Sequence, residues 1–479
     1  MVQPIILEPI VLFLGLVILL LEAFLPSPNR KQFAFLGIWG LAGVVVLTFF
    51  TSKVTPDAGF YAADSLAIFF KQIILVTTIV VLIMSLEFSG TLQQLVPAAK
   101  PGAGLGEFYA LPVFACAGLM WMASANDFIQ IFVSLELVTI TFYVLVSYLR
   151  KTRPSLEAGV KYLILGALST GILVYGITWI FGVTGQTNLA LVGQEAAKLD
   201  PKNHTALLFG IVLVLIALGF KVAAAPFQFW VPDVYQGAPS PVTAFLSVGS
   251  KSAGFIVLIR FLLAILPVPG IGTKVAAGVS VLAFCTLIYG NFAALPQTNL
   301  KRLLAYSSIA HAGYLLIAAT ALTAVGAVEA IAIYLAAYLV MTLLSFLVLI
   351  VATANLEGDD ISHFNGLSSK SPILAFGMLV AMISLAGVPF TAGFIGKFLI
   401  FKVAIESHLW WLVGLGVVSV ACGFYYYLKV VKAMYWQPAT GNTPRFQVSA
   451  LAKGTISVAV AAIFVLGVYP QPLLDLLAR

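Results

Sequence analysis

The sequence predicts an all-α polytopic membrane protein that crosses the bilayer about fourteen times. Of its residues, 61% are hydrophobic and only 9% are charged, whereas a soluble domain carries about 25% charged residues. Apolar segments of about 20 residues, the length that spans a bilayer, recur from one end to the other. No strand-like alternation persists between them, so a soluble two-layer fold is excluded.

The predicted spans follow one another with short polar breaks between them, such as Glu357-Gly358-Asp359-Asp360. The first span carries Glu8 and Glu22 and has no basic N-terminal region, so we expect a membrane helix there rather than a cleaved signal peptide. The fourteen predicted spans are 4–25, 32–51, 64–87, 107–124, 127–149, 155–182, 205–235, 241–266, 274–295, 300–323, 326–354, 371–404, 408–436 and 450–470.

Spans seven and twelve each contain both a lysine and a proline. Lys221 precedes Pro226, and Lys397 follows Pro389. A lysine at membrane depth costs about 2.5 to 3.5 kcal/mol on insertion scales, and a proline interrupts the helical hydrogen bonds. Non-helical backbone at that depth is tolerated only where protein or a water-filled cavity receives it. We therefore expect two discontinuous helices that line an ion or proton path.

The two interruptions also predict an internal repeat. Pro226 and Pro389 lie 163 residues apart, and each falls in the fourth member of a five-span set, spans 4–8 and spans 9–13. Because five is odd, adjacent sets run in opposite senses, which is the pattern of an inverted repeat. The expected division is flanking spans in 1–106, a first repeat in 107–266, a second repeat in 267–436, and a last span with a short tail in 437–479.

The net charge of the chain is +7. No run of basic residues in the sequence indicates nucleic-acid binding, so we attribute the excess to the bias of basic residues in loops that orients membrane helices. This bias predicts odd-numbered connections on the inner side and both termini on the outer side. Connections after odd-numbered spans contain Arg30, Lys31, Lys100, Arg150, Lys151, Arg153, Lys301, Arg302, Lys370, Lys429, Lys432, Arg445 and Lys453. The other side contains Lys53, Lys198, Lys202, Lys274, Lys402 and Arg479.

Five titratable residues fall at similar depth within the spans: Glu136, Lys221, Lys251, His311 and Lys397. Such residues are functional candidates by default. Burial weakens the hold of a lysine on its proton and a nearby carboxylate strengthens it, while histidine titrates near neutral pH. We predict a proton path in which Glu136 controls Lys221, Lys251 and His311 relay the proton, and Lys397 exchanges it with one aqueous side. The simpler interpretation, structural pairing and packing, stays open for each residue.

Other polar residues receive secondary roles. Lys161 is a candidate helper to Glu136, although it could extend to the membrane surface, as could Arg260 and Lys402. Asp233 is expected at a water-facing end beside the first break. Hydroxyl groups that could hold water, or simply allow close packing, belong to Ser247, Ser250, Ser252, Ser307, Ser308, Tyr306 and Thr391.

The sequence predicts no cofactor site in this chain. Cys116, Cys285 and Cys422 lie far apart, without the spacing of metal ligands or of a disulfide framework. The four histidines form no HxxH or HExxH pattern, and no glycine-rich nucleotide loop is present. Any redox groups are therefore expected in other proteins.

Three segments resemble the antiporter-like membrane subunits of respiratory complex I, an NADH:quinone oxidoreductase. They are WVPDVYQGAPSPVTAFLSVGSK from Trp230, LLAYSSIAHAGYL from Leu303 and LAGVPFTAGFIGKF from Leu385. Within that family the Pro-Asp-Val-Tyr stretch and Lys251 are similar to the N subunit. Only Gln471 to Arg479 follow the last span, which disfavours the L subunit with its lateral helix, and Lys397 disfavours the M subunit, which usually has glutamate there.

The resemblance implies roles for individual residues. The family's glutamate of span five falls on Glu136, its lysines of spans seven, eight and twelve on Lys221, Lys251 and Lys397, and its helper lysine on Lys161. It also implies two inverted five-helix repeats, and partners that comprise other antiporter-like and small membrane subunits and a peripheral arm. Flavin, iron–sulfur clusters and quinone are expected in those partners.

The leading hypothesis is thus outward proton translocation in a bacterial inner membrane, ahead of a thylakoid membrane, driven by quinone reduction in other subunits. An Mrp-type Na⁺/H⁺ antiporter subunit is the main alternative, although hard cations prefer oxygen ligands to lysines. A solute transporter with a midplane site and a structural spacer remain further alternatives.

Overall fold

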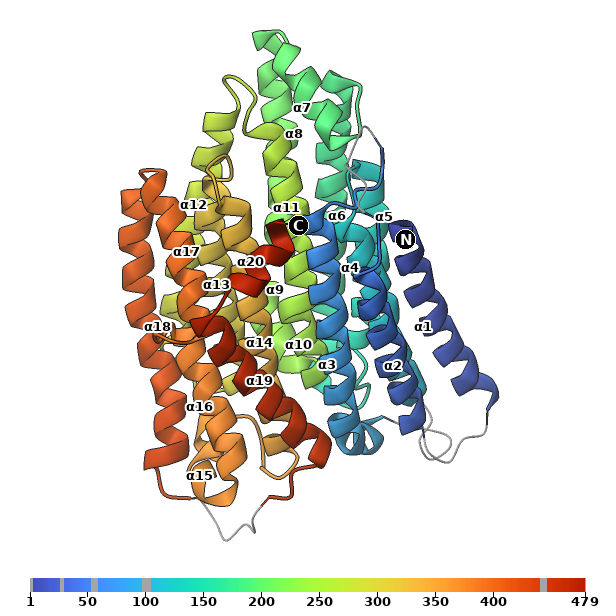
Figure 1. Cartoon of the computed structure of the whole chain (residues 1–479), viewed down its shortest axis with the longest axis vertical. Coiled ribbons are helices and arrows are strands. Elements are labelled where there is room, and N and C mark those ends of the chain that lie inside the picture. The colour runs from blue at the N-terminus through green and yellow to red at the C-terminus, as the bar shows by residue number, and fades with distance from the viewer. Residues whose placement is uncertain (1–2, 26–29, 53–58, 97–104, 440–445, 479) are drawn as a thin grey trace.

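In the computed structural model, the chain is a bundle of long helices (Figure 1). The structure describes residues 3–25, 30–52, 59–96, 105–439 and 446–478. In these ranges it contains no named strand, only three isolated β-bridges, so the all-α prediction is confirmed. Four basic residues of the orientation argument, Lys53, Lys100, Arg445 and Arg479, lie outside the described residues.

The flanking spans lie at one edge of the bundle, with α1 outermost (Figure 1). A 3₁₀ turn (Pro4–Ile6) precedes them, and they are α1 (Leu7–Phe24), α2 (Lys31–Thr48) and α3 (Ser65–Leu95). The Asp64 side chain caps α3 by accepting a hydrogen bond from the Ala67 backbone N–H at 2.8 Å, which satisfies one of the free donors at a helix start. The chain therefore turns sharply into α3 at Asp64.

The next set of helices contains the first interruption. Its members are α4 (Leu105–Ala123), α5 (Phe128–Val146), α6 (Arg153–Thr184), α7 (Leu189–Lys198), α8 (His204–Val222), α9 (Trp230–Gly237), α10 (Ser240–Phe245) and α11 (Lys251–Ile265). A π-helical turn (Leu246–Ser250) joins α10 to α11 and ends immediately before Lys251. A short 3₁₀ turn (Pro201–Asn203) leads into α8.

The last set contains the second interruption, and α18 forms the edge of the bundle opposite α1 (Figure 1). Its members are α12 (Gly272–Ala294), α13 (Leu300–Thr320), α14 (Ala327–Thr353), a 3₁₀ turn (Ile361–Phe364), α15 (Leu367–Lys370), α16 (Pro372–Ala386), α17 (Ala392–Glu406), α18 (Trp410–Trp436), α19 (Ala450–Val468) and α20 (Gln471–Ala478).

The predicted spans correspond to helices throughout the described residues. Thirteen helical segments there are long and apolar enough to cross a membrane. The predicted twelfth span is absent from that set because its halves, α16 and α17, have only 15 residues each. That the two halves together form a fourteenth crossing stays a prediction. The division at 106, 266 and 436 and the inverted relation of the two sets stay predictions.

Both prolines interrupt their spans as expected. Helix α8 ends at Val222 and α9 begins only at Trp230. Helix α16 ends at Ala386 and is followed by Gly387, whose φ of +94° lies in the left-handed region that glycine adopts without steric cost. The chain resumes in α17 at Ala392. The two lysines therefore lie next to backbone that is not helical.

Small residues bring the central helices close together. A Cβ on Gly176 of α6 would lie 2.9 Å from the Gly210 carbonyl oxygen of α8. A Cβ on Gly290 of α12 would lie 2.5 Å from the Ala310 nitrogen of α13. Close backbone approach of this kind is how membrane helices associate without a hydrophobic driving force. Gly290 thereby sets the distance of α13, which carries His311.

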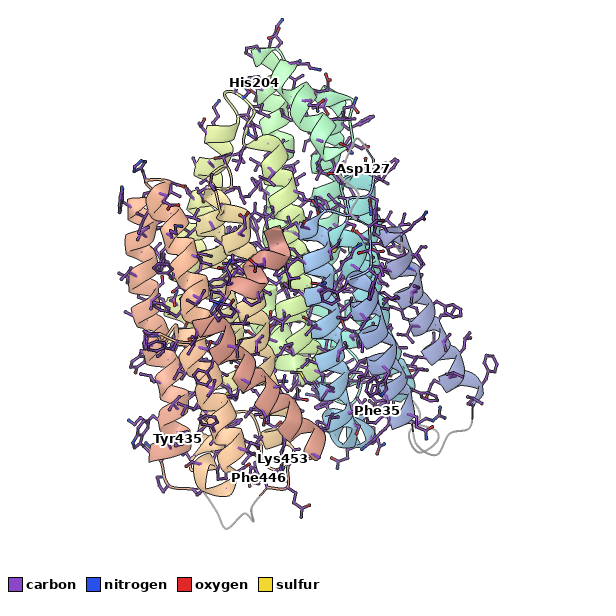
Figure 2. The ribbon with its side chains drawn as sticks, viewed as in Figure 1. Phe35, Asp127, His204, Tyr435, Phe446 and Lys453 are labelled. Atoms are coloured by element: carbon purple, nitrogen blue, oxygen red, sulfur yellow. The ribbon has the colours of Figure 1, made fainter. Side chains whose placement is uncertain are left out.

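The most buried helices occupy the middle of the bundle. In α13 and α14, 94% of the most apolar 18-residue stretch is buried, against 22% in α19. Asp127 and His204 lie at one end of the bundle, whereas Tyr435, Phe446 and Lys453 lie at the other (Figure 2). The connection after span six and that after span thirteen therefore lie at opposite ends, as alternating spans require.

Candidate functional site

Lys221 contacts the helix that carries Glu136. Thr139 follows Glu136 by three residues on α5, so the two side chains share one helix face. The Lys221 Nζ, in the last turn of α8, donates a hydrogen bond to the Thr139 Oγ1 at 2.8 Å. One carboxylate oxygen of Glu136, Oε1, is buried and has no hydrogen-bond partner among the described residues. Lys221 thus reaches the Glu136 face of α5 through Thr139, and the pairing of Glu136 with Lys221 stays a prediction.

Lys251 connects α11 to α13. Its Nζ donates to the Ser308 Oγ at 2.5 Å and to the Ser308 carbonyl oxygen. One turn further on, Gly254 faces Lys221, because a Cβ at Gly254 would lie 3.6 Å from the Lys221 Cβ. Lys251 is only 2% exposed. The lysines of spans seven and eight therefore lie on adjoining surfaces of α8 and α11.

His311 lies one turn after Ser308 on α13 and is held between two tyrosines. Its Nδ1 is 2.6 Å from the Tyr334 Oη, and its Nε2 is 3.1 Å from the Tyr427 Oη. The ring is 1% exposed. Because both ring nitrogens have hydroxyl partners, the imidazole can accept a proton at one nitrogen and release one from the other.

Lys397 lies after the second interruption and forms hydrogen bonds with the residues before it. From α17 its Nζ donates to the carbonyl oxygens of Leu385, at 2.9 Å, and Ala386, at 2.7 Å. These are the last residues of α16, whose carbonyls have no partner within the helix. Lys221 occupies a different position, inside the helix that ends at the first interruption. The two lysines are not structural equivalents.

Tyrosines that the sequence analysis did not identify connect the lysines to His311. The Lys251 Nζ lies 5.2 Å from the ring centroid of Tyr338, which itself lies 5.1 Å from the His311 ring. The Lys397 Nζ lies 5.1 Å from the ring centroid of Tyr314. The available signal was spacing: Tyr314 follows His311 by three residues, and Tyr334 and Tyr338 share one face of α14.

Lys161 pairs with other carboxylates than Glu136 in this structure. Its Nζ is 2.7 Å from the Glu157 Oε1 and 2.6 Å from the Asp233 Oδ2. The second oxygen of Asp233 is 2.9 Å from the Arg302 Nη1. Asp233 therefore joins α6 to α13 from the start of α9, and a cavity of about 420 Å³ adjoins it. The role of Lys161 as a helper to Glu136 stays a prediction.

Arg260 and Lys402 differ in their surroundings. Lys402 is exposed, with its Nζ 3.9 Å from the Glu406 carboxylate. Arg260 does not extend to the surface as the sequence allowed, because its side chain is 8% exposed and pairs with Asp64. Lys71 of α3 was not predicted as a buried cation; its Nζ is 2.7 Å from the Glu8 Oε1, and both side chains are fully buried. The described residues include no cluster of three or more metal-ligating side chains.

Comparisons with known proteins identify the family. Residues 125–423 match the family described as "NADH:quinone oxidoreductase/Mrp antiporter, TM". NADH-quinone oxidoreductase subunit N of Desulforamulus reducens is 38% identical over 466 residues, covering 96% of this chain and 94% of the relative. The subunit N of Trichlorobacter lovleyi is 38% identical over 471 residues, covering 98% and 94%.

A solved structure gives the same result. A chain of respiratory complex I from Thermus thermophilus, with bound aureothin, superimposes with a TM-score of 0.80 at 31% identity, covering 98% of both chains. The expected resemblance is thus confirmed, and it extends over nearly the whole chain. The chain belongs to the NADH:quinone oxidoreductase/Mrp antiporter family, and the two relatives above are each named as subunit N.

Proposed function

We propose that this chain is a proton-translocating, non-redox membrane subunit of an NADH:quinone oxidoreductase. Its relatives of full length are named as subunit N of that enzyme. The observation that carries the residue assignment is the row of Glu136, Lys221, Lys251, His311 and Lys397, of which the last four are buried. From Lys221 onward, neighbouring members are connected by a close helix contact or an aromatic ring. Lys221 also contacts Thr139, on the helix of Glu136.

Glu136 and Lys221 form the input of the proposed relay. A carboxylate near an ammonium group favours the protonated lysine, and burial opposes it. A movement that brings Glu136 toward Lys221 therefore loads the lysine, and a movement apart releases the proton. The unpartnered Oε1 of Glu136 supports this role, because a buried carboxylate oxygen without a donor costs free energy that a new partner recovers.

Lys251 and His311 carry the proton across the middle of the bundle. The Ser308 hydroxyl accepts from Lys251, and a hydroxyl can pass a proton by accepting on one side while donating on the other. His311 then receives the proton at one ring nitrogen and releases its own from the other toward Lys397. The Ser252 Oγ is buried without a partner among the described residues, which favours ordered water along this stretch.

Lys397 forms the output. Two of its three N–H groups are donated to the Leu385 and Ala386 carbonyl oxygens, which leaves one for transfer. The interruption between α16 and α17 is the place where the backbone can adjust as the charge of Lys397 changes. Lys397 is accordingly assigned to exchange with one aqueous side.

The partners proposed for the chain are the other antiporter-like and small membrane subunits and the peripheral redox arm of such a complex. Flavin, iron–sulfur clusters and quinone are assigned to those partners. Localisation in a bacterial inner membrane, with both termini on the outer side, follows from the basic connections. The oxidoreductase name of the full-length relatives favours this function over Na⁺/H⁺ antiport.

The test replaces Glu136 or Lys221 with alanine in the assembled complex. We expect fewer protons moved per electron, because the input can no longer be loaded and released. The measurement is proton uptake into inside-out vesicles during NADH oxidation, with the subunit content of the membranes quantified in parallel. A matched control is Lys402→Ala, which removes an exposed lysine outside the row. Unchanged pumping in both row variants would remove these residues from the mechanism.

A further inference from the structure

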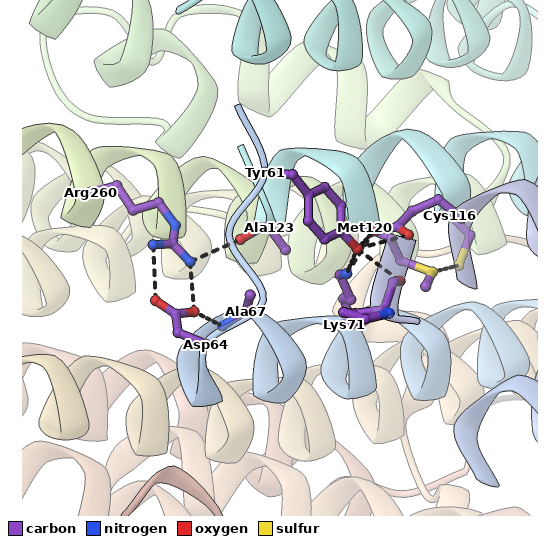
Figure 3. A network of polar contacts seen from close by, with 10 residues as sticks. Tyr61, Asp64, Ala67, Lys71, Cys116, Met120, Ala123 and Arg260 are labelled. Atoms are coloured by element: carbon purple, nitrogen blue, oxygen red, sulfur yellow. Dashed lines mark hydrogen bonds and ion pairs between the residues drawn. The ribbon is translucent and has the colours of Figure 1, made fainter. Parts of the chain in front are cut away.

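Arg260 is fixed at the far end of the helix that carries Lys251. Its Nη2 is 2.8 Å from the Asp64 Oδ1 and its Nη1 is 3.1 Å from the Asp64 Oδ2, so the fork of the guanidinium meets both carboxylate oxygens (Figure 3). Nη2 also donates to the Ala123 carbonyl oxygen at 3.4 Å. A bidentate contact of this kind fixes orientation as well as distance.

Lys251 and Arg260 point to opposite sides of α11. They are nine residues apart, which on an α-helix corresponds to a rise of about 13.5 Å and a rotation of two and a half turns. Lys251 reaches α13 through Ser308, and Arg260 reaches the start of α3 through Asp64. The helix is thus held from two opposite faces, and it cannot rotate about its axis while both contacts persist.

Asp64 is itself anchored by the segment that precedes α3. Asp64 Oδ1 caps α3 at Ala67, and the Ala62 backbone N–H donates to the Ser124 carbonyl oxygen at 2.8 Å. The Tyr61 Oη accepts from the Lys71 Nζ at 2.5 Å and lies 3.1 Å from both oxygens of Glu8 (Figure 3). Burial and the Glu8 carboxylate raise the pKa of the Tyr61 phenol, so this hydroxyl keeps its proton and donates. Arg260 therefore binds a carboxylate, that of Asp64, whose position is fixed by the surrounding segment.

The surroundings of α11 leave it room to move without this contact. The π-helical turn Leu246–Ser250 precedes Lys251 directly, and such turns frequently lie at functional sites in helices. On the other side of Arg260, a cavity of about 430 Å³ lies between α7 and the end of α11, lined by Gly193, Arg260 and Ala264 among others. The guanidinium Nε has no hydrogen-bond partner among the described residues.

We infer that Asp64 and Arg260 are positioning residues for Lys251: they fix the rotation of α11 so that the lysine ammonium meets Ser308. This inference rests on the proposed function, because it assigns a device that aims one member of the relay. The Glu22–Arg30 pair, by contrast, joins the end of α1 to the start of α2, with the Glu22 Oε2 2.6 Å from the Arg30 Nη1. It is not part of the network that anchors Asp64, so it provides a matched control of the same chemistry.

The test compares Asp64→Asn, Arg260→Lys, Glu22→Gln and Lys251→Ala in the assembled complex. Asparagine remains a good helix cap, so Asp64→Asn removes the charge while keeping the start of α3. Arg260→Lys keeps the charge but loses the fork. We expect both to lower the protons moved per electron toward the value of Lys251→Ala at unchanged subunit content. Glu22→Gln should leave the ratio unchanged once subunit content is matched.

A charge exchange, Asp64→Arg combined with Arg260→Asp, should recover part of the ratio that either single exchange loses. The outcomes separate the two proposals. If Lys251→Ala pumps normally, the relay itself fails. If Lys251→Ala loses pumping while Asp64→Asn and Arg260→Lys pump normally, only the positioning role is overturned. A fall in the ratio with Glu22→Gln as large as with Asp64→Asn would also overturn it, because the effect would not be specific to α11.

Discussion

Lys397 combines a structural contact with a chemical one. Its ammonium group holds the two carbonyl oxygens at the end of α16, those of Leu385 and Ala386, and the same group is the proposed proton carrier. Release of the third proton leaves two N–H groups for these carbonyls, but their hydrogen bonds are then no longer charge-assisted and are about half as strong. Loss of the proton from Lys397 therefore weakens the closure of the interrupted span. This couples charge at one residue to the backbone of span twelve.

The variants Lys397→Met and Lys397→Arg separate the two contributions. Methionine removes the donors and the charge, so we expect a lower denaturation temperature of the subunit and fewer protons per electron. Arginine keeps donors and charge but does not release its proton in proteins, so stability should be retained better than pumping. Both quantities can be measured on the purified complex. Normal pumping by Lys397→Arg would show that proton release at this position is not required.

At the level of residues, the lysines could be predicted from sequence because each is costly at membrane depth. The tyrosines around His311 could not, because aromatic residues are common in apolar helices. The spacing of Tyr334 and Tyr338 places them on one helix face but does not show which residue of another helix they contact. Lys71 carried the same signal as the others, but its partner Glu8 belongs to a different helix. A partner that is distant in sequence is invisible until the helices are arranged.

Helices α12 and α13 show how an element positions the site. Gly290 allows the two backbones to approach, and Ala310, which it contacts, is the neighbour of His311. Any side chain at Gly290 must push α13 away, because the nearest atoms belong to backbone. The contacts of His311 with Tyr334 and Tyr427, which come from two other helices, would then lengthen.

Gly290→Ala should therefore be harmful although alanine favours helices. We expect overpacking to destabilise the subunit by about 1–3 kcal/mol and to reduce pumping. Gly278→Ala on the same helix is the matched control, since a Cβ there meets nothing within 4 Å. That variant should be neutral or slightly stabilising. The measurements are the denaturation temperature and the proton-to-electron ratio of each variant. Equal values for Gly290→Ala and Gly278→Ala would contradict this explanation.

The interruptions of spans seven and twelve were predictable elements, because a proline cannot continue a helix without losing a hydrogen bond. The sequence did not predict that the lysines beside the two interruptions contact different kinds of partner. Lys221 lies at the end of α8 and contacts Thr139 of α5, whereas Lys397 reaches back across its own interruption. The distinction depends on which helix lies beside each end, which is a tertiary property.

Across the whole molecule, similar ion pairs differ in strength because of where they lie. The Glu8 and Lys71 side chains are fully buried, while Lys161 and Asp233 are 41% and 35% exposed. Removing one partner of a buried pair leaves an uncompensated charge and costs about 3–5 kcal/mol. Exposed pairs are worth about 0–1 kcal/mol. Stability should thus depend on the flanking helices more than on the Asp233 junction.

Glu8→Gln and Asp233→Asn test this difference with the same chemical change. We expect the first to lower the denaturation temperature of the subunit clearly and the second to change it little. Thermal unfolding of the purified complex, followed by loss of this subunit from the assembly, provides the measurement. A larger shift for Asp233→Asn would mean that the junction of α6, α9 and α13 holds the bundle together.

The sequence by itself determined the all-α membrane class, the two interruptions and the polar residues that are costly at membrane depth. These follow from local composition, because hydrocarbon penalises each charge and each unpaired backbone group wherever it occurs. Only the tertiary structure decided which groups meet: Lys221 against Thr139, the tyrosines beside His311, and Asp64 against Arg260. Contacts between helices far apart in the chain depend on how all of them pack, and no local pattern encodes that.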